Sequence, residues 1–184
     1  MEVKDRKESL RRLIIEKAIR KSDVGFILAS GRRSNLYIDL RKITQDPQGI
    51  NLIGRLLLNK IQEIAPESDC VGGLETASIP ISTAICMLSF SAKKPLVAFW
   101  VRKQEKDHGL RNRIEGNLQR GAKVAIIEDT VTTGGSSLQA IEAVRESEAI
   151  VIQALAVVDR GGAESFRKVG VPFIALFTEN DLVA

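Results

Sequence analysis

Long hydrophobic runs are missing from this sequence of 184 residues. A membrane-spanning helix needs about 18 or more consecutive apolar residues, and no stretch approaches that length. The first residues, from Met1 to Arg12, carry too many charges for a secretory signal. We therefore expect a cytoplasmic protein that has no membrane partner.

Cysteine and histidine are scarce, with two copies of the first and one of the second. Cys70 and Cys86 stand among apolar and small residues, with no further cysteine pair and no nearby histidine to complete a zinc site. We interpret both as buried free thiols, because free cysteine behaves as a small hydrophobic residue. The sequence singles out no metal-ligating residue.

A strong charge of one sign is also absent. Lysine and arginine total 27, aspartate and glutamate total 23, and the formal net charge is +4. This excess is not gathered into one tail, and no DNA-binding module is recognisable, so we expect small phosphate-bearing ligands rather than nucleic acid. With 44% hydrophobic residues, the chain has the composition of one folded domain over residues 1–184.

The N-terminal part, residues 1–45, predicts a small hood. Apolar residues at helical spacing predict a helix over 5–21. Two short strands, over 24–28 and 35–40, flank a turn at 30–33. A second helix begins at Asp46-Pro47 and runs to about residue 64.

Residues 66–184 alternate short apolar runs with helical segments. Runs at 70–74, 96–101, 124–127, 150–158 and 173–177 are typical of strands buried on both faces. The segments 79–90, 136–146 and 163–169 are long enough for crossover helices. This alternation predicts an α/β fold with an open, mainly parallel sheet that binds ligands beyond the carboxyl ends of its strands.

The most informative segment is 124–138, VAIIEDTVTTGGSSL, in which an apolar strand ends in two acids and a Thr/Gly/Ser loop opens a helix. Unpaired backbone N–H groups at a helix N-terminus bind phosphate, and the Walker pattern of nucleoside triphosphatases is absent. Glu128 and Asp129 could accept hydrogen bonds from the hydroxyls of an attached sugar. The alternative is a capped helix start with both acids in solvent. The combination of strand, acids and loop favours a ribose 5-phosphate site.

Glu128 to Ser136 resembles the phosphoribosyl pyrophosphate signature of the type I phosphoribosyltransferases. The resemblance implies a five-stranded parallel core beneath a variable hood, with Glu128 and Asp129 on the ribose hydroxyls. It also implies that the 5-phosphate binds to the loop Thr130, Val131, Thr132, Thr133, Gly134, Gly135 and Ser136. It does not specify the base.

A second segment, 101–116, reads VRKQEKDHGLRNRIEG and is too highly charged for a core, so we expect a mobile loop. Taken alone, its His108 could be a solvated bystander. The pattern resembles the catalytic loop of the orotate phosphoribosyltransferases, which implies that Arg102, Lys103, Lys106 and His108 contact pyrophosphate. The resemblance makes Lys106, His108 and Asp129 the catalytic residues. It also implies a homodimer in which the loop 103–116 reaches the neighbouring subunit's site.

Two other segments fit the same family. Residues 26–42 resemble its hairpin over the base, and Arg160 resembles the arginine that meets orotate, with Thr132 also on the base. Arg160 could instead be an ordinary loop cation. This chain departs from many family members at two places. Where it has Ala29 they carry a polar or basic residue, and within 76–78 they carry a lysine or glycine in the loop that holds pyrophosphate. We therefore do not assign the family's substrate contacts to these two places.

The implied reaction joins orotate to the ribose of phosphoribosyl pyrophosphate and releases pyrophosphate, giving orotidine 5'-monophosphate. We expect Mg²⁺ as the cofactor, bound mainly to phosphate oxygens and water, with no definite protein ligand. Two alternatives remain open at this point. One is a transferase for another base such as adenine, which would not need Arg160 or the Lys106/His108 loop. The other is a noncatalytic regulator that binds nucleic acid through a basic face.

Overall fold

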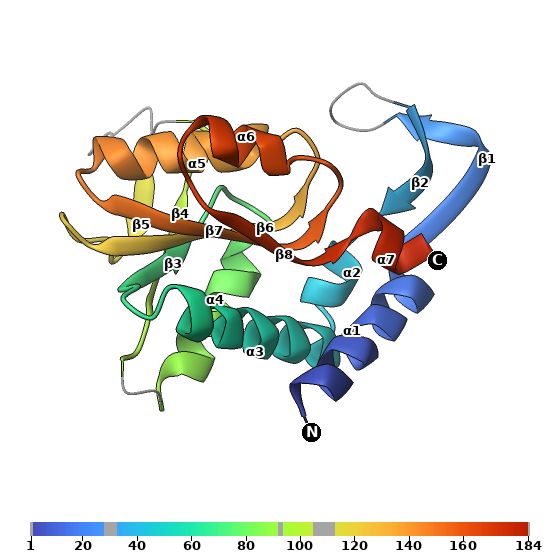
Figure 1. Ribbon diagram of the computed structural model, residues 1–184, viewed down its shortest axis with the longest axis horizontal. Helices are drawn as coiled ribbons and strands as arrows, with labels where there is room; N and C mark the ends of the chain where they lie inside the picture. The colour runs from blue at the N-terminus through green and yellow to red at the C-terminus, as the bar shows by residue number, and fades with distance from the viewer. Residues whose placement is uncertain (1, 28–32, 92–93, 105–112, 184) are drawn as a thin grey trace.

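The computed structural model describes residues 2–27, 33–91, 94–104 and 113–183. A central sheet lies between two helical layers, and a hairpin stands out beside them (Figure 1). On one side of the sheet lie α1 (Val3–Lys17), α3 (Pro47–Ile64) and α4 (Ser78–Ser89). On the other side lie α5 (Gly135–Glu146) and α6 (Ala163–Lys168).

The main sheet has six strands in the order β5-β4-β3-β6-β7-β8. Five of them are parallel: β3 (Cys70–Gly72), β4 (Val97–Val101), β6 (Lys123–Val131), β7 (Ile150–Asp159) and β8 (Phe173–Thr178). The predicted parallel α/β core is confirmed. An antiparallel edge strand that the sequence did not predict, β5 (Ile114–Gly116), pairs with β4. It lies within the segment predicted as a mobile loop, and its three residues have no hydrophobic pattern that would mark a strand.

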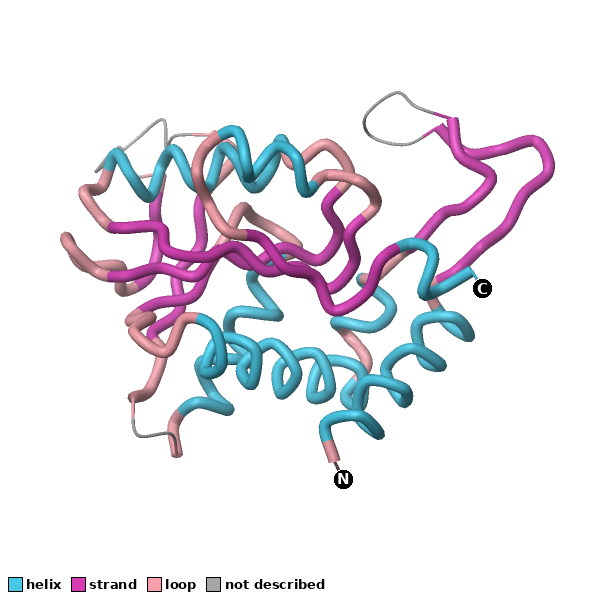
Figure 2. The backbone as a smooth tube through the Cα atoms, viewed as in Figure 1, coloured by secondary structure: helices cyan, strands magenta, loops and turns pink. Residues whose placement is uncertain are grey.

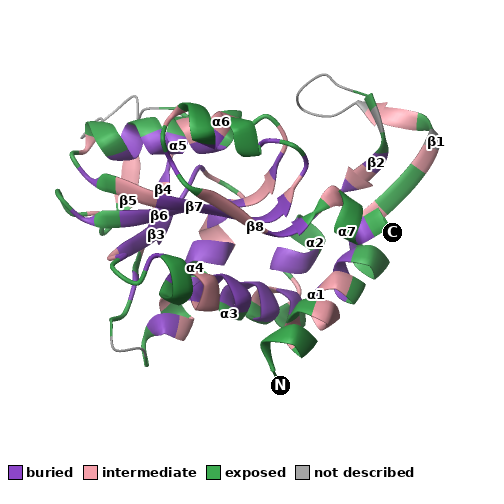
Figure 3. Cartoon of the chain, in the orientation of Figure 1, coloured by how far each residue is buried: buried purple, intermediate pink, exposed green. Residues whose placement is uncertain are grey.

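Alternate residues of β6 pack into two different hydrophobic clusters, one on each face of the sheet, which explains why the strand is apolar throughout. Ala125 and Ile127 belong to the cluster that includes α1 and α3, whereas Val124 and Ile126 belong to the cluster that includes α5. All four are buried, as the purple centre of the sheet shows (Figure 3). Both faces of the strand therefore exclude water, as predicted.

The hood is a two-stranded antiparallel sheet of β1 (Ile19–Ile27) and β2 (Arg33–Ile38), which leaves the compact part of the chain as a long hairpin (Figure 2). The helix predicted over 5–21 ends early, at Lys17, because Ile19 to Lys21 pair with β2. Pairing with a distant strand overrides the local helical pattern there. The predicted strand at 35–40 also lies two residues too late.

Other boundaries differ by a few residues. β6 continues four residues beyond the predicted end, since Thr130 and Val131 pair with β7. Two short helices went unpredicted, α2 (Arg41–Thr44) and α7 (Glu179–Val183). The α3 prediction is confirmed: Asp46 caps the helix by accepting hydrogen bonds from the backbone N–H groups of Gln48 and Gly49, both at 2.9 Å.

Both cysteines are free, but only Cys70 is buried; Cys86 is half-buried on α4, so that part of the prediction is wrong. Position 86 lies at the border between the buried face of α4 and its exposed face, which carries Met87 and Phe90. Within the described ranges, no helix combines the length and apolar character that a bilayer crossing requires.

Candidate active site

A cavity of about 790 Å³ opens where the carboxyl ends of the parallel strands meet the hood. The ends of β6, the loop after β3, the residue Lys103 after β4, strand β2 and helix α2 all contribute to its wall. Its described lining consists of Tyr37, Ile38, Asp39, Leu40, Arg41, Thr44, Gln45, Leu74, Glu75, Thr76, Ala77, Ile79, Pro80, Lys103, Glu128, Asp129, Thr130 and Ser136. The position agrees with the general rule for ligand sites in open α/β sheets.

Two acids at the end of β6 form one wall of this cavity. Glu128 is 6% exposed, and its carboxylate accepts a hydrogen bond of 3.3 Å from the hydroxyl of Ser137 on α5. Asp129 is half-buried and accepts a 2.6 Å bond from the backbone N–H of Thr130. The alternative of two solvated acids beside a helix start is therefore wrong.

Burial raises the pKa of both acids. Loss of water around the carboxylate, followed by repulsion from Asp129, raises the pKa of Glu128 to about 8. Burial likewise raises the pKa of Asp129, while hydrogen bonds from its surroundings and the nearby positive charge of Arg41 oppose that rise.

The loop after β6 forms an adjoining hollow of about 240 Å³, which shares Glu128, Thr130 and Ser136 with the main cavity. Its other described lining residues are Val131, Thr132, Thr133, Gly134, Gly135, Ser137 and Gln139. Thr130 and Val131 belong to β6 itself, so the loop is shorter than the predicted 130–136. The hollow lies at the N-terminus of α5, where backbone N–H groups lack helical partners, and it suits one phosphate group.

Gly134 is the residue that shapes this loop. It caps α5 in a left-handed conformation, with φ of 79°. A Cβ atom there would lie 2.0 Å from the hydroxyl oxygen of Ser165 on the neighbouring segment. Both the backbone angle and the lack of space therefore require glycine.

Strand β2 and helix α2 form a wall of the cavity whose lining residues were not predicted from the sequence. Leu36, Ile38 and Leu40 are buried, and Ile38 and Leu40 line the cavity together with the alternate residues Tyr37 and Asp39. Arg41 follows on α2. The signal that could have found these residues is the period-2 alternation of apolar and polar side chains over 36–41.

The loop after β3 closes the opposite side. Residues 74–77 of this loop, with Ile79 and Pro80 at the start of α4, line the cavity. Glu75 in this loop accepts a 3.0 Å hydrogen bond from the backbone N–H of Lys103, which joins it to the end of β4. Lys103 is itself among the lining residues.

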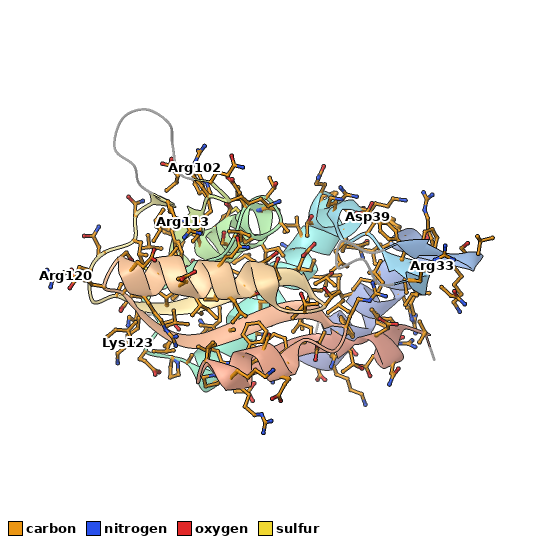
Figure 4. All side chains as sticks on the ribbon, turned by 90° about the horizontal axis from the view of Figure 1, so that it is seen from above. Arg33, Asp39, Arg102, Arg113, Arg120 and Lys123 are labelled. Atoms are coloured by element: carbon orange, nitrogen blue, oxygen red, sulfur yellow. The ribbon has the colours of Figure 1, made fainter. Side chains whose placement is uncertain are left out.

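The predicted pyrophosphate-binding residues are only partly described. Arg102 is not among the described lining residues; its guanidinium lies 3.7 Å from the carboxylate of Glu115 on β5. Figure 4 shows Arg102 near Arg113, where β4 and β5 meet, and Asp39 on the hood side of the molecule. Lys106 and His108 lie outside the described residues, as does Ala29.

Arg160, predicted to meet orotate, follows β7 and is buried. Its side chain is 3% exposed, pairs with Glu179 of α7 at 2.5 Å, and donates to the backbone carbonyl of Leu36 at 3.1 Å. The alternative of an ordinary loop cation is therefore wrong. Arg160 is not among the described residues of the cavity wall. It ties the hood strand β2 and helix α7 to the end of β7.

Comparison with known proteins decides the family. The orotate phosphoribosyltransferase of Aquifex aeolicus is 42% identical over 180 residues, which cover 96% of this chain and 97% of that protein. The chain belongs to the orotate phosphoribosyltransferase family. A crystal structure of the Mycobacterium tuberculosis orotate phosphoribosyltransferase with Fe(III) dicitrate has a TM-score of 0.82 at 35% identity, covering 98% of this chain and 99% of that one. No family model matches the chain.

Another crystal structure of the M. tuberculosis orotate phosphoribosyltransferase, in complex with 5-phospho-alpha-D-ribosyl 1-diphosphate, has a TM-score of 0.76 at 29% identity and covers 97% of this chain and 92% of that one. Membership of the orotate phosphoribosyltransferase family makes this chain a glycosyltransferase of pyrimidine biosynthesis. It excludes the two alternatives left open by the sequence, a transferase for another base and a noncatalytic regulator.

Proposed function

We propose that this chain transfers the 5-phosphoribosyl group of phosphoribosyl pyrophosphate to a ring nitrogen of orotate, giving orotidine 5'-monophosphate and pyrophosphate. One observation carries the proposal. The buried Glu128 and the half-buried Asp129 lie at the end of β6, and Glu128 also lines the phosphate-sized hollow at the N-terminus of α5, so a ribose 5-phosphate can meet the acids and the hollow at once.

The proposed roles follow from this placement. Glu128 and Asp129 accept hydrogen bonds from the ribose hydroxyls, and the 5-phosphate lies on Thr132 to Ser136, with Thr130 and Val131 at the end of the strand. Pyrophosphate lies between the loop at 74–77 and Lys103. Thr132 and Arg160 stay predicted orotate residues, and Arg102, Lys106 and His108 stay predicted pyrophosphate residues, with Lys106, His108 and Asp129 as the catalytic group.

The chemistry is displacement at the anomeric carbon. Positive charge develops on the sugar and negative charge on the departing pyrophosphate, so positioning and electrostatic stabilisation dominate. The carboxylates of Glu128 and Asp129 face the side on which the sugar becomes positive. Lys103, with the predicted loop cations, faces the anion that leaves.

Mg²⁺ is the proposed cofactor. It accepts oxygen ligands and retains several waters, and the oxygens of Glu75 and Asp129 on the cavity wall are donors of this type. When bound with pyrophosphate, the ion would neutralise part of the charge of the leaving group.

We also propose that the enzyme acts in the cytoplasm as a homodimer in which the loop 103–116 serves the neighbouring site. Two free cysteines fit a reducing compartment. The N-terminal end of this loop, at Lys103, lies on the rim of the cavity and so leaves the sheet at the site.

The decisive experiment measures orotate consumption by its ultraviolet absorbance, with phosphoribosyl pyrophosphate and Mg²⁺ present. We expect turnover with orotate and loss of turnover when Mg²⁺ is chelated. Equal or faster turnover with adenine, guanine or uracil would contradict the assignment of the base, while an absence of turnover with every base would contradict the proposed reaction.

A further inference from the structure

One acid of the cavity wall has a position that its charge does not explain. Glu75 is half-buried in the loop after β3, which is proposed to hold pyrophosphate together with Lys103. A carboxylate at this place repels a polyanion. Asp39, in comparison, lines the same cavity but is paired with the guanidinium of Arg41. Glu75 therefore needs a role that outweighs the repulsion.

The backbone next to Glu75 continues the sheet for a short distance beyond β3. Leu74 forms an isolated parallel bridge with Val101. The Val101 N–H donates to the carbonyl of Gly73 at 2.8 Å, and the Glu75 N–H donates to the carbonyl of Val101, also at 2.8 Å. The next bond of a parallel ladder would run from the N–H of Lys103 to the backbone carbonyl of Glu75. That N–H instead donates to the Glu75 side chain, at 3.0 Å from Oε1, so the carboxylate takes the place of a backbone carbonyl.

Three successive N–H groups at the end of β4 have partners on both sides. Val101 and Lys103 donate toward the loop after β3, and Arg102 between them donates to the carbonyl of Arg113 at 2.8 Å, next to β5. Two of these three bonds run between backbone groups, so a side-chain substitution does not remove their acceptors. The third depends on the carboxylate of Glu75. Glu75 therefore fixes the backbone at the point where the chain leaves the sheet.

The direction of the Lys103 side chain depends on this backbone group. Lys103 lines the cavity, whereas Arg102 is not among the described lining residues and lies beside Glu115 on β5. Adjacent side chains point to opposite sides while a chain follows the extended path of a strand. A rotation of the peptide before Lys103 would therefore turn its ammonium group away from the cavity.

We propose that Glu75 is a positioning residue, whose carboxylate holds the backbone of Lys103 so that the Lys103 ammonium faces the departing pyrophosphate. The inference rests on the proposed function. The role requires an acceptor oxygen at this place and not a negative charge. A glutamine side chain carries such an oxygen and an alanine side chain does not. The two substitutions therefore distinguish positioning from a role of the charge.

The test measures kcat/KM for phosphoribosyl pyrophosphate at saturating Mg²⁺, so that a weaker affinity for the ion does not lower the rates. Glu75→Ala should lower it by about 10- to 100-fold, because a misplaced cation no longer meets the charge that develops on pyrophosphate. The KM for orotate should stay within about 2-fold. Glu75→Gln should lower kcat/KM by less than about 3-fold, since its amide oxygen can accept the same hydrogen bond.

Removal of the Lys103 side chain tests whether Glu75 acts through it. Lys103→Ala keeps the backbone N–H, so the bond to Glu75 can still form although the ammonium that it positions is gone. Glu75→Ala should therefore lower kcat/KM by less than about 2-fold further in the Lys103→Ala background. Amide hydrogen exchange followed by NMR tests the bond itself. The Lys103 N–H should exchange at least about 10-fold faster in Glu75→Ala than in the parent, and near the parent rate in Glu75→Gln.

Glu67→Ala is the matched control. It removes the same side chain from an exposed position in the loop before β3, and Glu67 is not among the described lining residues of the cavity. Both the kinetic constants and the exchange rate at Lys103 should be those of the parent.

The outcomes separate this inference from the proposed function. If the parent protein does not consume orotate, the proposed reaction itself is wrong. If the parent is active and Glu75→Ala keeps its kcat/KM, or if Glu75→Gln loses as much as Glu75→Ala, the positioning role is overturned while the reaction stands. An equal loss from Glu75→Ala with and without the Lys103 side chain would also overturn it, because the carboxylate would then act on another group.

Discussion

At the scale of single residues, the decisive feature is a carboxyl group kept away from water. Glu128 is 6% exposed and has its pKa raised to about 8, first by burial and then by Asp129. Such an arrangement is costly to the folded state, so a role in ligand binding explains it better than a role in stability. Ribose hydroxyls that donate to the carboxylate would favour its ionised form.

The stability of the protein should therefore depend on Glu128 in a particular pH window. Below about pH 4.5 the carboxyl is neutral in the folded and unfolded chains alike. As pH rises from 4.5 to about 8, the unfolded chain loses this proton while the folded one keeps it, so the folded state loses stability. Glu128→Gln removes this loss. We expect its free energy of unfolding to match the parent near pH 4.5 and to exceed it by about 4 kcal/mol at pH 8.

Urea unfolding at several pH values measures this difference directly. Glu142→Gln, which neutralises an exposed carboxylate on α5, is the control and should show a flat difference. A difference for Glu128→Gln that stays flat or falls with pH would mean that the carboxyl is not the buried neutral group described here. The same variant should bind phosphoribosyl pyrophosphate more weakly at every pH.

At the scale of secondary-structure elements, the site depends on the junctions between elements rather than on their interiors. Glu128 and Asp129 lie near the end of β6, and the chain then turns at Gly134 into α5. Arg160 joins the end of β7 to β2 and α7. The hood therefore depends on a contact between residues 124 positions apart in the sequence.

The glycine pair of the phosphate loop provides a matched test of this geometry. In Gly134→Ala, the new Cβ would meet Ser165 and the residue would adopt a left-handed φ, so we expect a loss of about 1–3 kcal/mol of stability and weak binding of phosphoribosyl pyrophosphate. In Gly135→Ala, the nearest atom of the surroundings is the Thr133 hydroxyl oxygen at 3.7 Å, an ordinary contact.

Thermal unfolding of the two variants distinguishes the local strain from a general effect of alanine in the loop. Gly135→Ala should unfold near the parent temperature, and Gly134→Ala several degrees below it. Equal unfolding temperatures would show that the loop can relax around position 134.

At the scale of the whole molecule, the proposed active site belongs to two chains. The described cavity combines the strand ends of the core with the hood, and Lys103 at its rim begins the loop that carries Lys106 and His108. In the proposed homodimer, each site then joins Asp129 of one chain with Lys106 of the other.

Two differently disabled chains should complement each other in that arrangement. Lys106→Ala lacks the loop cation and Asp129→Ala lacks a ribose contact, so each homodimer should be nearly inactive. Random exchange of equal amounts puts about half of the dimers in the mixed form, each with one intact site of two, so about a quarter of the parent activity should return. Orotate consumption after mixing measures the recovery. If native mass spectrometry confirms exchange and no activity returns, the loop serves its own subunit.

The sequence by itself determined the core of the fold and the chemistry of the phosphate site. Apolar runs such as 124–127 can be recognised as strands because a parallel strand must exclude water on both faces. The motif Glu128 to Ser136 can be recognised because its acids and glycines are adjacent along the chain. Asp46-Pro47 likewise marks the start of α3 by purely local capping.

Only the tertiary structure decided what depends on distant pairing. β1 begins at Ile19 because it pairs with β2, and the short segment of β5 forms a strand because it pairs with the edge of β4. Arg160 was predicted to meet orotate, with an ordinary loop cation as the alternative, and the structure buries it against Glu179 and the carbonyl of Leu36. The sequence did not single out Arg41, which lines the cavity beside Asp39. The sequence could not separate the two arginines, because the burial and partners of a side chain depend on elements remote in the chain, and a local pattern does not contain them.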